Sequence, residues 1–193
     1  MLDIESLLVE IRGCRLCTRH LPLGPRPVIR AAATAKLLIV GQAPGTKVHE
    51  SGVPWNDKSG ERLRDWLQVS EDVFYDQTRV AIMPMGFCYP GRDANGGDKP
   101  PRTECAPEWH PKVLPLMPDV ELTVLVGIYA QKYYLGQAAK KTMTETVRQW
   151  RAYLPRFLPT PHPSWRNTGW IRKNPWFETE VLPELRQRVR RLI

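Results

Sequence analysis

The chain has 193 residues, 42% of them hydrophobic, and its 28 Lys and Arg residues outnumber its 20 Asp and Glu residues to give a formal net charge of +8. Because no apolar run approaches the roughly 18 residues that a transmembrane helix needs, and because the first residues lack the pattern of a secretory signal, we expect a cytoplasmic protein without a membrane partner. The basic balance favours a polyanionic partner, with nucleic acid ahead of an anionic membrane surface.

Apolar runs alternate with helical patterns along the chain. The runs predict strands at Leu37–Val40, Val80–Met83, Leu122–Gly127 and Phe157–Thr160. The other periodic segments predict helices at Leu2–Ile11, Glu61–Leu67, Ala106–Met117, Tyr129–Leu135, Thr144–Tyr153 and after Pro175. This alternation predicts an α/β fold, a three-layer α/β/α sandwich with a central, mostly parallel four-stranded sheet. We expect one domain over residues 1–193 and, since no oligomerisation surface stands out, a monomer.

Four cysteines form a candidate metal site: Cys14, Cys17, Cys88 and Cys105. The first two are spaced as C-x-x-C, which lets two thiolates converge on one metal, and each later cysteine lies beside a Pro- and Gly-rich loop. Small buried apolar residues and a redox pair are the alternatives. A shared metal is favoured because all four are used in a reducing compartment, but the spacing does not distinguish zinc from a 4Fe–4S cluster.

The first strand ends in the turn Gly-Gln-Ala-Pro-Gly, residues 41–45. In an open parallel sheet, ligands bind at this carboxyl edge. The turn lacks both G-x-x-x-x-G-K-[ST] and G-x-G-x-x-G, which excludes a Walker-type phosphate cradle. Gln42 can donate and accept hydrogen bonds at an amide-like edge, so the turn is a candidate for binding a base.

The segment that follows carries an aromatic ring and a carboxylate. Trp55 offers a flat stacking face, and Asp57 lies close to the start of the predicted helix. Asp57 has two readings that the composition does not separate. It is either the N-cap of that helix or a general base beside a bound base.

The last strand leads into a loop with His162 between two prolines. Its position after a strand of an open sheet favours a functional over a structural histidine. A hydroxyl, an apolar wedge, a cation and an amide follow it: Ser164, Trp165, Arg166 and Asn167. Such groups suit a loop that unstacks a duplex and contacts phosphates, and the alternative is a Pro-rich surface loop with a core Trp.

Together these residues resemble the uracil-DNA glycosylase superfamily over nearly the whole chain. KLLIVGQAPG, residues 36–45, is similar to its first motif, and HPSWRN, residues 162–167, is similar to its second, His-Pro-Ser-type motif. The cysteine framework resembles the iron–sulfur frame of the family four and family five enzymes. The resemblance therefore implies a 4Fe–4S cluster, with zinc as the second choice.

The resemblance also implies residue roles for a DNA base-excision repair glycosylase that acts on flipped-out uracil or another deaminated base. Pro54-Trp55 is similar to the Pro-Phe of family four, whose ring stacks on the base, and Asp57-Lys58-Ser59-Gly60 is similar to the Asp-x-Ser-Gly of family five, whose Asp is the catalytic carboxylate. His162 would stabilise charge on the base, and Gln42 with the backbone at Ala43 would read its edge. The loop Pro163–Asn167 and the C-terminal cations would bind DNA.

Three positions depart from the superfamily. Ala43 stands where family one carries its water-activating Asp, and Gln42 stands where family four carries Glu. Pro84 and Met85 lie near the place where an Asn would read uracil. The second functional hypothesis is therefore a catalytically weak or inactive DNA-binding, damage-sensing module of the same fold.

Overall fold

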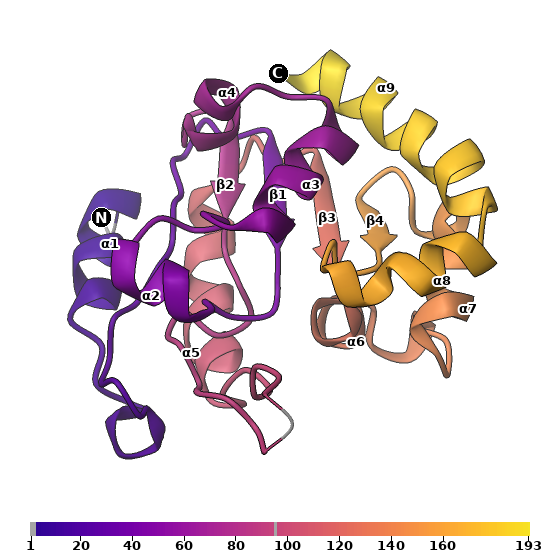
Figure 1. The fold of residues 1–193 in the computed structure, drawn as a ribbon. Coiled ribbons are helices and arrows are strands. Elements are labelled where there is room, and N and C mark those ends of the chain that lie inside the picture. Colours follow the sequence, from indigo (N-terminus) through magenta and orange to yellow (C-terminus); the bar gives the residue numbers. More distant parts are fainter. Residues whose placement is uncertain (1–2, 95) are drawn as a thin grey trace.

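The computed structural model, which describes residues 3–94 and 96–193, is built on a four-stranded parallel sheet with the order β2-β1-β3-β4 (Figure 1). The strands are β1 (Leu37–Val40), β2 (Val80–Ile82), β3 (Leu122–Val126) and β4 (Phe157–Thr160). Leu38 is in register with Ala81 on one side and with Thr123 on the other. The predicted fold class is confirmed, and each predicted strand lies within one residue of its observed ends.

Helices cover both faces of this sheet (Figure 1). The helices are α1 (Ile4–Arg12), α2 (Thr46–Ser51), α3 (Lys58–Leu67), α4 (Glu71–Tyr75), α5 (Cys105–Val113), α6 (Ile128–Leu135), α7 (Met143–Arg148), α8 (Thr168–Lys173) and α9 (Leu182–Leu192). Leu38 and Val40 pack with α1, α5 and α6, whereas Leu37 and Ile39 pack with α3, α4, α7 and α9. The strands are therefore buried on both sides, which explains why they appear in the sequence as continuous apolar runs.

The helices differ from the predictions mainly where they are short. The helices α2, α4 and α8 have only five or six residues, too few to show a 3.6-residue period, and the sequence did not predict them. The predicted helix Thr144–Tyr153 is divided into α7 and a 3₁₀ turn, Trp150–Tyr153. Leu2, the predicted start of the first helix, lies outside the described residues; the helix begins after Asp3, whose carboxylate caps it by accepting a hydrogen bond from the Ser6 N–H at 2.8 Å.

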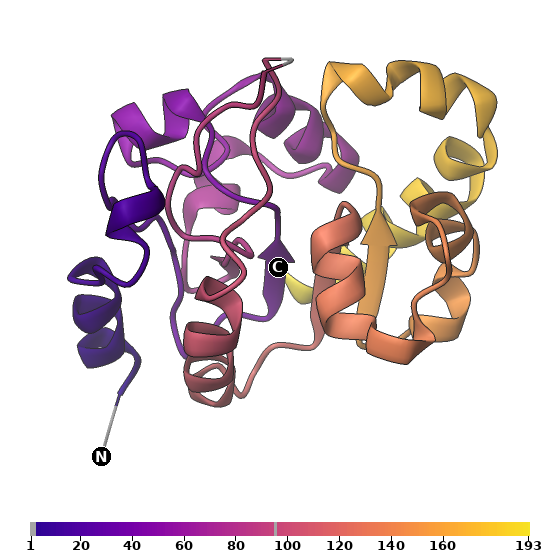
Figure 2. The ribbon, with the colours of Figure 1, turned by 90° about the horizontal axis from the view of Figure 1, so that it is seen from below.

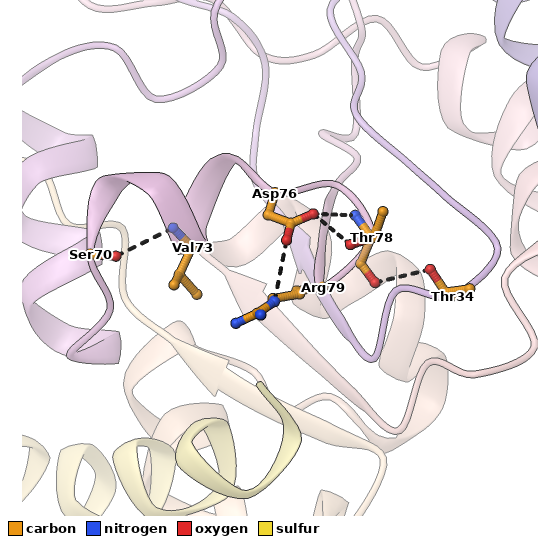
Figure 3. Close-up of polar contacts among 6 residues, drawn as sticks. All are labelled: Thr34, Ser70, Val73, Asp76, Thr78 and Arg79. Carbon is orange, nitrogen blue, oxygen red and sulfur yellow. Dashed lines mark hydrogen bonds and ion pairs between the residues drawn. The ribbon is translucent and has the colours of Figure 1, made fainter.

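Polar contacts fix the turn that leads into β2 (Figure 3). The Asp76 carboxylate accepts hydrogen bonds from the backbone and the hydroxyl of Thr78 and pairs with Arg79 at 3.2 Å. The hydrogen bonds from Thr78 hold the pKa of Asp76 below its usual value. The Thr34 hydroxyl, from the segment before β1, donates to the Thr78 carbonyl at 3.1 Å. These contacts place the amino ends of β1 and β2 side by side.

All four strands end at the same edge, which Figure 2 views directly. The loop between β2 and α5 extends across this edge (Figure 2). Beyond the strands, backbone pairing continues, because the Met85 N–H donates to the Gly41 carbonyl at 2.9 Å and the Gly86 N–H to the Gln42 carbonyl at 3.0 Å. The turn after β1 is therefore held rigidly beside the segment after β2. None of the helices described here is long and apolar enough to cross a membrane.

Candidate active site

A pocket of about 670 Å³ opens at the carboxyl edge of the sheet. The turn after β1, the segment before α3, Pro84 and the loop after β4 all contribute to its wall. It brings together all five residues predicted to bind a base or to catalyse: Gln42, Ala43, Trp55, Asp57 and His162, with Ser164 beside them. Asp57 and His162, which come from opposite halves of the chain, thus face one cavity.

Asp57 is both a helix cap and a residue of the pocket wall. Its backbone is extended, and its Oδ1 accepts a hydrogen bond from the Gly60 N–H at 2.8 Å, so it is the N-cap of α3. The same side chain lines the pocket. Because the cap uses one oxygen, the carboxylate is held in a fixed orientation at the pocket wall.

His162 is held as a neutral hydrogen-bond donor. Its Nδ1 accepts a hydrogen bond from the Ser164 N–H at 3.2 Å, which places the proton of the neutral ring on Nε2. The Asn167 side chain donates to the His162 carbonyl at 2.7 Å and fixes the backbone. Burial lowers the pKa of His162 to about 4, against a smaller opposing effect of the Asp57 charge. The imidazole is therefore uncharged at neutral pH.

Trp55 lies between the first turn and His162. The ring centroids of Trp55 and His162 are 5.4 Å apart. Trp55 has a φ of 58°, a left-handed conformation that is uncommon for a residue with a side chain. A Cβ at Gly41 would come within 2.7 Å of the Trp55 ring, and a Cβ at Gly60 within 1.7 Å of the Trp55 carbonyl oxygen. Glycine at these two positions therefore allows Trp55 to enter the pocket wall.

We expect Gly60→Ala to lower the free energy of unfolding by about 1–3 kcal/mol, because the new methyl group overlaps the Trp55 carbonyl. Gly169→Ala is the matched control: Gly169 is also helical, and an added Cβ meets nothing within 4 Å. That control should be neutral or slightly stabilising. Urea denaturation of both variants measures the difference, and equal stabilities would contradict this packing.

Helices α3 and α4 each fix one side of the pocket by hydrogen bonds. Arg62 donates to the Ser164 carbonyl at 3.2 Å and to the Thr168 hydroxyl at 3.3 Å. On the other side, the Tyr75 hydroxyl donates to the Pro54 carbonyl at 2.9 Å. Arg62 is therefore a positioning residue for the loop that carries His162. Its partner Ser164 lies 102 positions away in the sequence, so no local pattern indicated this contact.

The residues predicted to contact DNA divide into buried and exposed ones. Pro163 is buried, and Ser164 and Asn167 support the His162 loop through the contacts described above. Trp165 projects outward with 75% of its surface exposed, and the exposed Arg166 guanidinium donates to the Gly96 carbonyl at 3.4 Å. The exposed surface of this loop thus consists mainly of one large apolar side chain and one cation.

The basic residues of α9 lie away from this loop. The helix runs to the edge of the sheet opposite the pocket (Figure 1). There Arg186 donates to the carbonyls of Asp65 and Trp66, and Arg190 lines a pocket together with Arg79. Arg188 forms an ion pair with Glu184. The expectation that these C-terminal cations bind the same DNA segment as the His162 loop is therefore not supported by their position.

The four cysteines line one separate pocket of about 390 Å³. Cys14 and Cys17 follow α1, Cys88 follows β2, and Cys105 begins α5. All four are free thiols. Burial raises the pKa of Cys88 to about 11 and that of Cys105 to about 12, although the Phe87 N–H donates to the Cys105 sulfur at 3.3 Å. Such buried thiols ionise readily only beside a positive group such as a metal.

The four thiols are candidate ligands of one shared group, although their spacing in the structure does not suit a single metal ion. Within residues 3–94 and 96–193, no three His, Cys, Asp or Glu side chains converge closely enough to hold a single metal ion. The four thiols nevertheless surround one pocket, and soft thiolate ligands suit iron–sulfur chemistry. Arg15 lies close to Cys88, and Arg102 lies close to Cys17. Each cation would offset the negative charge of the neighbouring cysteine in its thiolate form.

A family model described as the uracil DNA glycosylase superfamily matches residues 29–186. The matched region contains the complete sheet, every residue named above for the active-site pocket, and two of the four cysteines, Cys88 and Cys105.

Proposed function

Because the chain belongs to the uracil-DNA glycosylase superfamily, we propose that it hydrolyses the N-glycosidic bond of uracil, or of another deaminated base, flipped out of DNA. The observation that carries this proposal is the shared pocket of a neutral His162 and the carboxylate of Asp57. A base within a duplex cannot be reached by such a pocket, so the nucleotide must first leave the stack.

His162 would stabilise the negative charge that develops on the leaving base. When the bond between C1′ and the base nitrogen breaks, the electron pair remains on the base and places negative charge on its carbonyl oxygens. The Ser164 N–H occupies His162 Nδ1, so the ring proton is on Nε2, and the Nε2–H, which has no partner among the residues that the structure describes, would donate to uracil O2. A donor that is oriented before the reaction stabilises this charge without further rearrangement.

Asp57 would stabilise the positive charge that develops on the sugar. The same bond cleavage leaves oxocarbenium character on the sugar, and a fixed carboxylate offsets that positive charge and helps to position water. Its contact with Gly60 keeps the carboxylate in place before substrate binds.

The base itself is held by stacking and by backbone groups. Trp55 provides the stacking face, and the backbone at Ala43 faces the base edge. The Gln42 amide nitrogen already donates to the Lys99 carbonyl at 3.2 Å, which leaves its oxygen available to the base. Pro84 lines the pocket where the superfamily places an Asn, and Met85 is buried in the core. Uracil selectivity therefore depends on groups other than that amide.

The cysteine pocket would hold a 4Fe–4S cluster through Cys14, Cys17, Cys88 and Cys105. Bound there, the cluster would supply four metal–sulfur links and no step of the hydrolysis. The four cysteines connect the segment after α1 with both ends of the loop between β2 and α5. We assign the cluster a structural role because its pocket is distinct from the active-site pocket.

Trp165 is the proposed wedge that fills the gap left by the flipped nucleotide. We expect Trp165→Ala to slow excision from duplex DNA by about 10–100-fold, because unstacking a base costs a few kcal/mol. Excision from single-stranded DNA should change much less, since no stack has to be opened. Single-turnover rates on both substrates measure the effect, and equal losses on both would exclude the wedge.

The activity is tested with labelled oligonucleotides that contain uracil, hypoxanthine or xanthine. After incubation with the protein, alkali cleaves the strand only where an abasic site has formed. Cleavage of one of these substrates supports the proposed function. The departures at Ala43 and Pro84 favour one alternative, a damage-sensing module, which would bind these oligonucleotides without producing alkali-labile sites.

A further inference from the structure

Two adjoining cavities share a boundary at the carboxyl edge of the sheet. One is the active-site pocket, and the other extends from it along the loop that carries Arg166 and Asn167. The residues that line both cavities are Gln42, Ala43, Asp98, His162 and Ser164. Asp98 is the only carboxylate among these five. The other carboxylate of the active-site pocket, Asp57, does not line the second cavity.

This boundary is where the scissile bond of a flipped nucleotide would lie. The base would occupy the deep pocket, and the sugar–phosphate backbone would follow the exposed loop beside Trp165 and Arg166. The bond between C1′ and the base joins these two parts. We propose that Asp98 is a catalytic carboxylate that accepts a proton from the attacking water, a role that rests on the proposed glycosylase function.

The loop between β2 and α5 brings Asp98 to this place. The loop folds back on itself through hydrogen bonds from Asp93 N–H to Gly97 O at 2.8 Å and from Lys99 N–H to Gly91 O at 2.9 Å. Gln42 fixes the loop to the first turn through its bond to the Lys99 carbonyl. The Asp98 Oδ2 lies 3.5 Å from the position that a Cβ on Gly45 would take.

Asp98 thus places a carboxylate beside the turn at residues 41–45, which carries no carboxylate of its own. Ala43 cannot accept a proton, whereas Asp98 reaches the same turn from a loop more than 50 positions later in the chain. In this arrangement the carboxylate comes from the loop between β2 and α5, which packs against the turn, and not from the turn itself.

The surroundings of Asp98 suit a proton acceptor. Within the described part of the chain, the Asp98 carboxylate accepts no hydrogen bond, and the residue is open to solvent. The carboxyl group is nevertheless partly desolvated by its neighbours, which, together with the charges of Asp57 and Asp93, raises the pKa of Asp98, while Arg92 and Arg166 oppose this increase. A carboxylate with a raised pKa binds a proton more strongly than an ordinary surface carboxylate.

The proposed step is balanced by water alone. The bond between C1′ and the base nitrogen breaks, and its electron pair leaves with the base, next to the His162 N–H. The water oxygen forms the new bond to C1′, and one water proton passes to Asp98. That proton subsequently neutralises the base anion, directly or through solvent, so that the products are the free base and an abasic sugar.

The first test measures single-turnover excision by Asp98→Asn, which preserves the shape of the side chain but removes its charge. We expect the rate to fall by about 10²-fold or more, with DNA affinity unchanged or higher. Asp65→Asn is the control, because Asp65 is an exposed carboxylate on α3, and its rate should equal that of the wild type. A wild-type rate in Asp98→Asn, while the wild-type chain excises uracil, overturns the inference and leaves the proposed function intact.

The second test does not depend on turnover. DNA containing a pyrrolidine abasic analogue carries a positive charge at the place of C1′, whereas the tetrahydrofuran analogue is neutral. Two carboxylates near the scissile bond, Asp57 and Asp98, should make the wild type prefer the charged analogue by about tenfold or more, and Asp98→Asn should reduce this preference clearly while Asp57 keeps the remainder. If the preference of Asp98→Asn equals that of the wild type, Asp98 does not lie at C1′, whether or not the protein excises uracil.

Discussion

Replacing His162 with Ala lowers the single-turnover rate of uracil excision by about 10²–10³-fold, the usual loss when one preorganised donor to a developing negative charge is removed. His162→Gln should recover part of this loss, because an amide N–H can still donate to the base. Folding should be preserved, since His162 lies at the pocket wall and, among the residues that the structure describes, its ring takes part in one hydrogen bond. The measurement is base release with enzyme in excess over DNA.

The control for this substitution is His20→Ala, which removes an exposed histidine from the 3₁₀ turn Thr18–His20, outside the active-site pocket. Its excision rate should match that of the wild type. If His162→Ala also excises at the wild-type rate, the charge on the departing base is stabilised by another group, and the role given to His162 is wrong.

The pH dependence distinguishes a neutral from a charged imidazole. Since the pKa of His162 is about 4 in the folded protein, the neutral form dominates at all higher pH values. As pH rises from 5 to 8, the rate should therefore show no step near 6.5, the ordinary pKa of histidine. As pH falls through about 4, a proton is added at Nδ1, which can then no longer accept the Ser164 N–H. A step near 6.5 that disappears in His162→Gln would mean that the charged form takes part.

The residues that the sequence placed well are those whose chemistry is local. β1 and β4 were predicted with their observed ends because Gly or Pro follows each apolar run almost immediately. His162 was predicted as a site residue because the carboxyl edge of a parallel sheet is a binding edge regardless of the remaining fold. Asp57 was harder, since a capping residue and a pocket residue have the same sequence pattern, and here one side chain is both.

The residues that the sequence missed depend on long-range packing. Asp98 lies in a loop rich in Gly and Pro that carries no periodicity, and long-range hydrogen bonds, from Gln42 to the Lys99 carbonyl and from Arg166 to the Gly96 carbonyl, show where the loop is attached. In the sequence, Arg62 cannot be distinguished from an ordinary surface cation of α3. Its hydrogen bonds to Ser164 and Thr168 are seen only in the structure. In both cases the contact joins segments separated by more than 50 residues. Periodicity and motif patterns describe neighbouring residues, so they do not indicate contacts between such distant segments.

Replacing Cys17 with Ser should remove the iron of the protein and lower the free energy of unfolding by on the order of several kcal/mol, because binding energy at a structural metal site is also folding energy. The physical reason lies in the positions of the cysteines. Cys17 belongs to the segment after α1, and its pocket partners Cys88 and Cys105 lie at the two ends of the loop that carries Asp98. Loss of the cluster would release both the segment and the loop.

The measurement combines iron analysis, absorbance near 400 nm and chemical denaturation, none of which depends on activity. Arg19→Ser is the matched control, since Arg19 is exposed and only two residues from Cys17, and it should keep both iron and stability. Full iron content in Cys17→Ser would exclude Cys17 as a ligand. Zinc in place of iron in the wild type would replace the 4Fe–4S proposal with a four-thiolate zinc site. In that case the four sulfurs would have to move closer together than they are in the structure, because a single ion requires them to converge.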